Sequence, residues 1–174
     1  QRDMLMPQHY EEVARLLRAG ADAAAIRAVA NRIRLQLNPH PAGQSSHNIP
    51  ALEGESLDGM QHKYRETVLF FPSQGQTCHA YCSFCFRWPQ FVGMSDFKFA
   101  SREVDRLIDY LRAHPEVSDL LLTGGDPLIM SARNLAQYLE PLLDAGLPNL
   151  RRIRIGTKAL SYWPYRFLSD DDAP

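Results

Sequence analysis

The stretch TVLFFPSQGQTCHAYCSFC, residues 67–85, carries the two strongest structural signals in this chain. Residues 67–71 form a compact run of β-branched and aromatic side chains bounded by Pro72, which predicts a strand buried on both faces. All three cysteines of the chain follow directly, within eight residues. The sequence therefore predicts a buried strand that leads straight into a cysteine-rich loop.

Two further strands, at residues 120–123 and 153–156, alternate with two amphipathic helices. We expect Ser101 to cap the first helix and Ser131 the second, which ends with Gly146 at its C′ position. Strands that alternate with helices build parallel sheets, so the predicted fold class is α/β. A closed eight-unit barrel takes about 250 residues, and this region supplies about three strand-helix units.

The first third of the chain carries different signals. Helical spacing predicts one helix over residues 10–17 and a second that Asp22 caps. Residues 39–64 hold several prolines and glycines without any period, which predicts a long connector. We therefore expect an N-terminal helical segment with its connector over residues 1–64, and an incomplete βα domain over residues 65–174.

The composition is that of an ordinary globular protein. Of 174 residues, 45% are hydrophobic and 22% are charged, which excludes a disordered chain. A formal charge of −1 attracts neither nucleic acid nor an anionic membrane, and the apolar runs are far shorter than the roughly 20 residues that span a bilayer. With no secretory signal, we expect a soluble cytoplasmic protein without a nucleic-acid or membrane partner. Because the chain begins with Gln1, we expect its natural start to be missing, and its end is typical of the front of a longer protein.

Three clustered cysteines do not suit a disulfide framework, and they indicate a metal site in a reducing compartment. Three thiolates can hold three irons of a cubane cluster and leave one iron without a protein ligand. The alternative is a zinc-stabilised binding module, with His62 or His79 as the fourth ligand. The close spacing favours the cluster, and an inert set of thiols is the third interpretation.

A second motif, Gly124-Gly125-Asp126-Pro127, closes the strand at residues 120–123. Glycines at this position would let the backbone approach a ligand without interference from a Cβ atom. The alternative is an ordinary turn in which Asp126 caps a helix that begins at Pro127. Both interpretations stay open on the local sequence alone.

Together, the cysteine spacing C-x₃-C-x₂-C and the glycine motif resemble the radical S-adenosylmethionine (SAM) enzymes, and the aromatic residue before the third cysteine fits that pattern. The resemblance implies the front part of a partial TIM-type βα barrel that binds a [4Fe-4S] cluster and SAM. The implied cluster ligands are Cys78, Cys82 and Cys85, and the residues implied to help hold SAM are Phe84, Gly124, Gly125 and Asp126.

The closer resemblance is to the lysine 2,3-aminomutase branch, through residues 62–64, 85–87, 124–128 and 152–157. It implies an isomerase in which SAM is cleaved to a 5′-deoxyadenosyl radical that starts a 1,2-amino migration on an amino acid such as lysine. It also implies that Arg87 contacts the substrate carboxylate, and that an electron donor such as a flavodoxin or ferredoxin takes part. A homo-oligomer is a further implied state. Arg154 is expected to be structural.

The chain departs from that branch at two places. Aminomutases of the branch use pyridoxal phosphate, held by a lysine well after the third strand. Lys158 comes too early for this role, so the cofactor is expected only in a full-length protein. Residues 88–90, Trp-Pro-Gln, replace the basic pair usual after Arg87, and the identity of the substrate therefore stays open.

Two further alternatives keep the cluster loop but change the function. The same radical machinery would modify a lysine on a translation factor, or a degenerate member of the family would keep the loop without catalysis.

Overall fold

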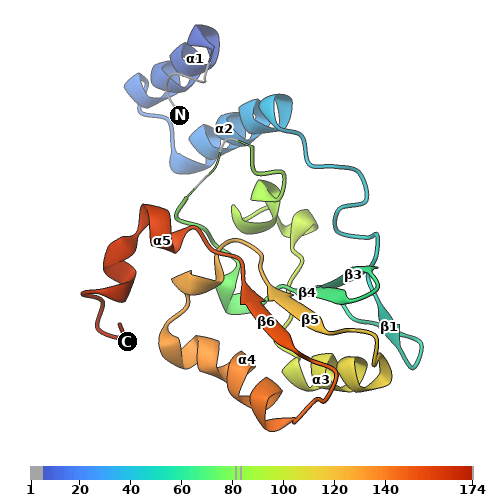
Figure 1. Ribbon diagram of the computed structural model, residues 1–174. Coiled ribbons are helices and arrows are strands. Elements are labelled where there is room, and N and C mark those ends of the chain that lie inside the picture. Colours follow the sequence, from blue (N-terminus) through green and yellow to red (C-terminus); the bar gives the residue numbers. More distant parts are fainter. Residues whose placement is uncertain (1–5, 81, 83, 174) are drawn as a thin grey trace. The chain divides into compact units, whose positions relative to one another are not determined.

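The computed structural model describes residues 6–80, 82 and 84–173 (Figure 1). The chain divides into two compact units. The helical unit consists of Gln1–Ala42 with Cys82–Phe86, and the sheet unit consists of Gly43–Tyr81 with Arg87–Pro174. Among the described residues, no helix combines the length and the apolar character that crossing a membrane requires.

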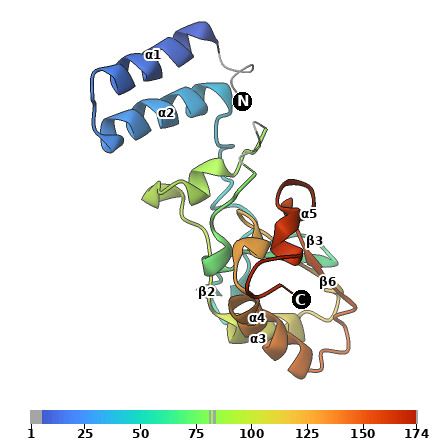
Figure 2. The same ribbon diagram turned by 90° about the vertical axis from the view of Figure 1, so that its left-hand side faces the viewer.

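The helical unit is built on two helices that lie side by side, α1 (Pro7–Arg18) and α2 (Ala23–Leu37) (Figure 2). The side chain of Asp22 accepts a hydrogen bond from Ala25 N at 2.8 Å and caps α2, as the sequence predicts. An ion pair between Glu12 and Arg32 joins the two helices. Both N-terminal helices predicted from the sequence are therefore present.

The sheet unit holds a four-stranded mixed sheet in the order β3 (Met60–Tyr64), β4 (Thr67–Phe70), β5 (Asp119–Leu122) and β6 (Arg152–Ile155). The last three strands are parallel, whereas β3 runs antiparallel to β4. The three strands predicted from apolar runs are all present, within one residue of their expected bounds. The sheet unit is therefore α/β.

The predicted connector over residues 39–64 contains regular structure that the sequence did not indicate. A short hairpin, β1 (Ala51–Leu52) with β2 (Glu55–Ser56), precedes β3. The sequence of β3, Met-Gln-His-Lys-Tyr, lacks an apolar alternation because only its first two residues are buried. Backbone pairing with β4 makes it a strand, and pairing of this kind leaves no local signal.

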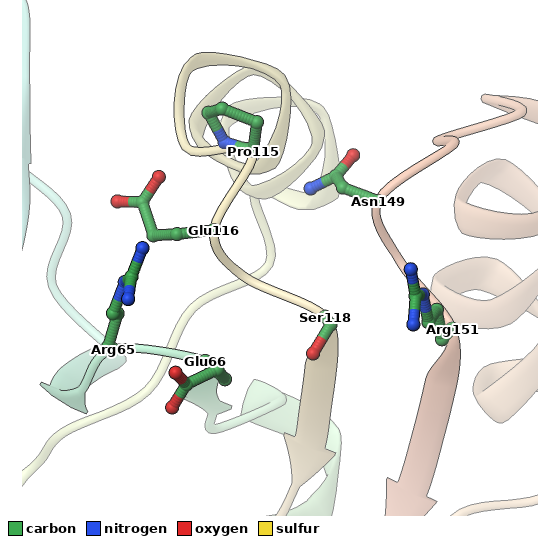
Figure 3. A pocket seen from close by; sticks show the side chains of 7 residues that line it. All are labelled: Arg65, Glu66, Pro115, Glu116, Ser118, Asn149 and Arg151. Carbon is green, nitrogen blue, oxygen red and sulfur yellow. The ribbon is translucent and has the colours of Figure 1, made fainter.

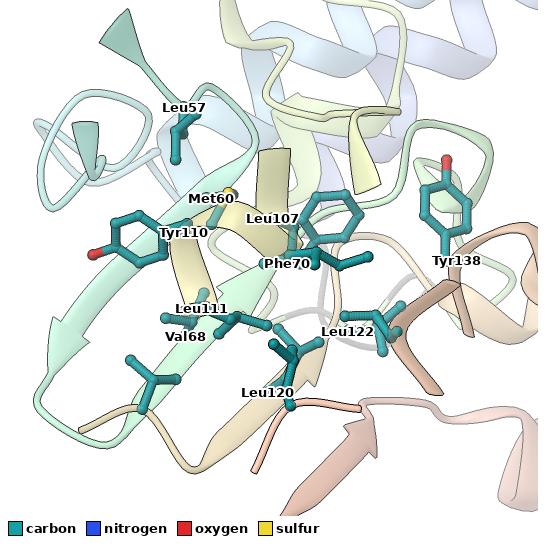
Figure 4. Close-up of a cluster of buried hydrophobic side chains, with 14 of the residues drawn as sticks. Leu57, Met60, Val68, Phe70, Leu107, Tyr110, Leu111, Leu120, Leu122 and Tyr138 are labelled. Atoms are coloured by element: carbon teal, nitrogen blue, oxygen red, sulfur yellow. The ribbon is translucent and has the colours of Figure 1, made fainter. Parts of the chain in front are cut away.

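Two helices, α3 (Val104–Ala113) and α4 (Ala132–Asp144), pack on one face of the sheet (Figure 4). Alternate residues of β4 and β5 point to that face, and burial of each side chain of leucine size contributes about 1.5–3 kcal/mol. The strand residues of this core are Val68, Phe70, Leu120 and Leu122, and the helix residues include Leu107, Leu111, Tyr138 and Leu142. On the opposite face, Leu69 and Leu121 are half-buried.

The two predicted serine caps have different outcomes. Ser131 caps α4, because its hydroxyl accepts from Asn134 N at 3.3 Å, and Gly146 follows the helix with a φ of 56°. The expected cap at Ser101 is wrong, because α3 begins after Glu103. The backbone N–H of Ser101 donates to the carbonyl oxygen of Phe71 at 2.8 Å, so Ser101 is bonded to the residue that follows β4 and lies before the N-cap of α3, Glu103.

Among the described residues, five short 3₁₀ helices and one short α-helix complete the sheet unit. They include the 3₁₀ helices Trp88–Phe91, Pro127–Ile129 and Pro164–Phe167, and α5 (Ala159–Tyr162), which follows β6. The loops after β4, β5 and β6 all leave the carboxyl edge of the parallel strands, where active sites of such folds gather.

Candidate functional site

Asp126, which follows the glycine pair after β5, lies at the centre of the carboxyl edge. It is 1% exposed, and one carboxylate oxygen, Oδ1, accepts from Leu128 N at 3.0 Å and from Thr157 Oγ1 at 2.7 Å. The other oxygen, Oδ2, accepts from Lys158 N at 2.7 Å and lies 3.2 Å from His79 Nε2. A single buried carboxylate therefore joins the loops that follow β4, β5 and β6.

These contacts confirm that Asp126 caps the helical turn that begins at Pro127, here a 3₁₀ helix. They also take up both carboxylate oxygens with donors of the protein itself. The expectation that Asp126 helps to hold SAM stays a prediction. In the sheet unit the Asp126 side chain is buried.

The glycine pair is required by a close approach of the loop after β4. A Cβ atom on Gly125 would lie 1.9 Å from the carbonyl oxygen of Thr77, which accepts a hydrogen bond from Asp126 N at 2.7 Å. Gly124 has a φ of 141°, and a Cβ there would lie 2.1 Å from Gln76 Nε2. The space freed by the missing side chains is therefore filled by this chain, and the two loops are in direct backbone contact.

Cys78 follows Thr77 and belongs to the sheet unit. Its Sγ atom accepts a hydrogen bond from Ala80 N at 3.4 Å. The next residue, His79, places its ring against Trp163, with 5.6 Å between the ring centroids. The first predicted thiolate ligand is thus held by a loop with several contacts to the carboxyl edge.

Cys82 and Cys85 belong to the helical unit, where the side chain of Asn38 donates to the carbonyl oxygen of Cys85 at 2.8 Å. Phe84, predicted to help hold SAM, is 75% exposed. Within each unit, the described residues contain no group of three His, Cys, Asp or Glu side chains that would hold a metal ion. The three-cysteine ligand set therefore stays a prediction from its spacing in the sequence.

Arg87, the predicted substrate contact, is bound to residues of β3 and of the segment that follows β4. Its Nη2 atom donates to Gln61 Oε1 at 2.9 Å, and its guanidinium carbon lies 4.6 Å from the centroid of the Phe71 ring. The Gln44 side-chain amide is assigned the orientation in which its oxygen faces donors. In that orientation the oxygen accepts from Nη1 and Nη2 of Arg87 at 3.0 and 2.9 Å. These contacts fix the plane of the guanidinium group.

Two side chains considered in the sequence analysis have clear structural partners. Arg154 donates to Asp119 Oδ1 at 2.8 Å, which agrees with the expected structural role. The ring of His62 lies 2.6 Å from the Tyr110 hydroxyl through Nδ1 and 3.2 Å from the carbonyl oxygen of Arg65 through Nε2. Because both ring nitrogens already have protein partners, His62 is poorly suited to be the fourth ligand of a zinc site.

A pocket lies at the opposite, amino edge of the sheet (Figure 3). Its lining includes Ser118 and Arg151, which directly precede β5 and β6. Asn149 Nδ2 there donates to the carbonyl oxygens of Leu111, His114 and Val117, at 3.1, 3.3 and 2.9 Å. Contacts of this kind close the end of a helix, and this edge of a parallel sheet is typical of stabilising interactions.

Sequence reasoning missed the residues that connect the loops. Thr157 was noted as part of a motif, but its bond to Asp126 spans 31 positions in the chain. Arg166 gave no signal, yet it is 7% exposed and donates to the carbonyl oxygens of Leu128 and Met130 at 3.1 and 3.0 Å. It also pairs with Asp172, whose pKa is lowered by the Ala132 backbone N–H and by Arg166.

No family model matches the chain. Over part of its length it is similar to proteins named L-lysine 2,3-aminomutase, and these partial matches support a relationship to that family. It is 42% identical over 114 residues to a protein of Aquifex aeolicus named as a candidate L-lysine 2,3-aminomutase, which covers 66% of this chain and 29% of that protein. It is 34% identical over 114 residues to the L-lysine 2,3-aminomutase of Bacillus subtilis, covering 66% of this chain and 23% of that one. The match to the enzyme of Clostridium subterminale is 34% over 110 residues, or 63% and 25%. The chain thus spans less than a third of the length of these relatives.

Proposed function

We propose that this chain is part of a radical SAM enzyme of the lysine 2,3-aminomutase type, an isomerase that moves an amino group between adjacent carbons of an amino acid. One observation carries the proposal. His79, next to the first cysteine, and Asp126, in the glycine motif, are 47 positions apart in the sequence. Even so, the two segments are in contact through side chains and backbone. Both motifs would serve one cofactor pair.

The arrangement of the helices supports a barrel-type fold. Side chains of both α3 and α4 join the same cluster on one face of the sheet. In a doubly wound fold, helices cover both faces, whereas in a barrel they form one outer layer. We propose that the sheet unit is the front part of a partial barrel, with half-buried Leu69 and Leu121 on its inner face.

The donor set suits an iron-sulfur cluster. Thiolates are the ligands of such clusters, and three of them, from Cys78, Cys82 and Cys85, would leave one iron for SAM. The N–H of Ala80 donates to Cys78 Sγ, and hydrogen bonds of this kind tune the reduction potential of a cluster. When bound, the cluster and SAM would supply an adenosyl radical, given one electron from a donor such as a flavodoxin or ferredoxin.

The proposed role of Arg87 is to bind the carboxylate of the amino acid substrate. Its planar guanidinium suits a carboxylate, and the contacts with Gln61 and Phe71 orient it in advance. Residues 88–90, which replace a basic pair, are buried in the 3₁₀ helix Trp88–Phe91. They pack within the sheet unit, so the choice of substrate would depend on other residues.

Pyridoxal phosphate would belong to the full-length protein. The backbone N–H of Lys158 is bonded to Asp126 in the buried layer of the site, and this lysine is not assigned to the cofactor.

Anaerobic reconstitution of the chain with iron and sulfide tests the proposal. We expect cubane absorption, and a low-spin EPR signal of the reduced cluster that changes when SAM is added. A variant with Cys78, Cys82 and Cys85 all replaced by alanine is the control, and it should bind no cluster. One zinc and no iron after anaerobic purification, or a signal that ignores SAM, would overturn the assignment. In the full-length protein, incubation with free lysine and with a translation factor would separate the aminomutase from the protein-modifying alternative.

A further inference from the structure

We propose that His79 is a positioning residue that, through Asp126, fixes the first thiolate ligand on the carboxyl edge before any cluster binds. This inference rests on the proposed function, because it takes Cys78 as a cluster ligand.

The His79 ring is held from two sides. On one side, Nε2 lies 3.2 Å from Asp126 Oδ2, and because a carboxylate oxygen only accepts, the ring must be the donor. On the other side, the indole of Trp163 meets the ring edge to face, with 5.6 Å between centroids. Only 17% of the His79 side chain is exposed. These contacts therefore fix both the orientation of the His79 ring and its partly buried position.

The anchor itself is rigid. Asp126 is 1% exposed, and donors from the loop after β6, Thr157 Oγ1 and Lys158 N, hold it at 2.7 Å each. A carboxylate with this many short bonds cannot turn without leaving buried donors unpaired. The position of Asp126 is therefore fixed by the loops of the sheet, and the bond from His79 holds the cysteine loop against it.

The contacts that fix the loop flank Cys78 closely in the chain. The carbonyl oxygen of Thr77 is bonded to Asp126 N at 2.7 Å, the ring of His79 is bonded to the Asp126 side chain, and Ala80 N–H points to the sulfur. The residues on both sides of Cys78 are thus tied to the same aspartate. The folded protein therefore orients the sulfur before a cluster binds. This reduces the conformational entropy that the loop would lose when a cluster is assembled.

The test compares three forms of the chain: wild type, His79→Gln and His79→Leu. Glutamine keeps an N–H donor for Asp126, whereas leucine removes it at similar size. Without added iron, hydrogen exchange read by mass spectrometry should be about tenfold faster in the segment around residues 77–80 of His79→Leu than in wild type, the factor expected for one lost hydrogen bond to a charged group. His79→Gln should stay close to wild type.

The second measurement is made after anaerobic reconstitution. We expect His79→Leu to lose iron to a chelator several times faster than wild type, and to give a broadened EPR signal, while His79→Gln retains both properties. Far-UV circular dichroism checks that each variant is folded. Should His79→Leu lose its fold, His79→Asn, whose shorter amide cannot reach Asp126, takes its place.

The outcomes separate the two proposals. Equal exchange and equal iron retention in wild type and His79→Leu overturn the positioning role and leave the proposed function intact. A wild-type chain that binds no iron overturns the proposed function, and the exchange measurement then still shows whether His79 anchors the loop.

Discussion

Two buried aspartates bracket β5, and their surroundings differ sharply. Asp119, at the amino end of the strand, pairs with Arg152 at 3.4 Å and with Arg154 at 2.8 Å. These arginine side chains are 70% and 45% exposed, so the pairs lie at the protein surface. Asp126, beyond the carboxyl end, is 1% exposed and is bonded to backbone and side-chain donors from three loops.

The difference shows how one strand can serve two purposes. Asp119 joins neighbouring strands through flexible charged side chains that water can also solvate, an arrangement of modest energetic value. Asp126 replaces water altogether with fixed donors, and each of them would be left unsatisfied by its removal. The amino edge therefore holds the sheet together, whereas the carboxyl edge fixes the geometry of a candidate site.

The largest expected effect comes from truncating Asp126, and the same truncation of Asp119 provides the comparison. Asp126→Ala should lower the free energy of unfolding by about 3–5 kcal/mol, because it leaves several buried donors without an acceptor. Asp119→Ala should cost about 1 kcal/mol or less, because its arginine partners turn to solvent. Urea unfolding followed by circular dichroism measures both. Equal costs would remove the contrast between the two ends of β5.

The second effect concerns the loop contact at the carboxyl edge. Gly125→Ala should destabilise the chain by about 1–3 kcal/mol or more, because its Cβ would clash with the carbonyl oxygen of Thr77 and force the backbone apart. Gly146→Ala is the matched control, since no atom lies within 4 Å of its would-be Cβ and only its φ of 56° opposes the change. That control should cost about 1 kcal/mol. A smaller loss for Gly125→Ala than for Gly146→Ala would contradict the close approach.

An intermediate effect is expected at the amino edge. Asn149→Ala should lower the free energy of unfolding by about 1–2 kcal/mol, because the carbonyl oxygens at the end of α3 lose a shared donor but can bind water. Asn149→Asp should cost more, because a carboxylate would face those carbonyl oxygens. Thermal unfolding of the two variants provides the comparison, and identical melting temperatures for Asn149→Ala and wild type would rule out this role.

The smallest effect is a pH dependence at the same edge. Its own backbone N–H and the side chain of His114 lower the pKa of Glu116 from its ordinary value. A carboxylate whose pKa is lower in the folded state stabilises the fold above its unfolded pKa of about 4.5, and this contribution is lost as the pH falls through the folded pKa. Glu116→Gln should therefore melt slightly below wild type at pH 7 and equal to it near pH 2. A constant difference across that range would show that Glu116 does not act through its charge.

Local patterns predicted much of this fold. The apolar stripe of α3, the caps Asp22 and Ser131, and the run that forms β4 all depend on residues a few positions apart, where spacing alone carries the information. The edge strand β3 was missed because polar side chains occupy most of it and its partner supplies the pairing.

The candidate site was predictable only in part. The cysteine spacing and the glycine motif were visible, and so was the capping role of Asp126. The bonds from Asp126 to His79 and Thr157 depend on how three loops meet at one edge of the sheet, which no local pattern encodes. For the same reason, the close approach of Gln76 to Gly124 and of Thr77 to Gly125 could not be predicted, and a role of the two glycines in holding SAM stays a prediction.

The backbone bond between Asp126 and Thr77 makes neighbours of two loops that are far apart in the chain. Opening either loop away from the other would break this bond, so we expect their movements to be coupled. Local opening of the glycine turn and movement of the segment around Cys78 would thus occur together. If Cys78 is a cluster ligand, as proposed above, this coupling would leave few partly open states in which a bound cofactor is exposed to oxygen.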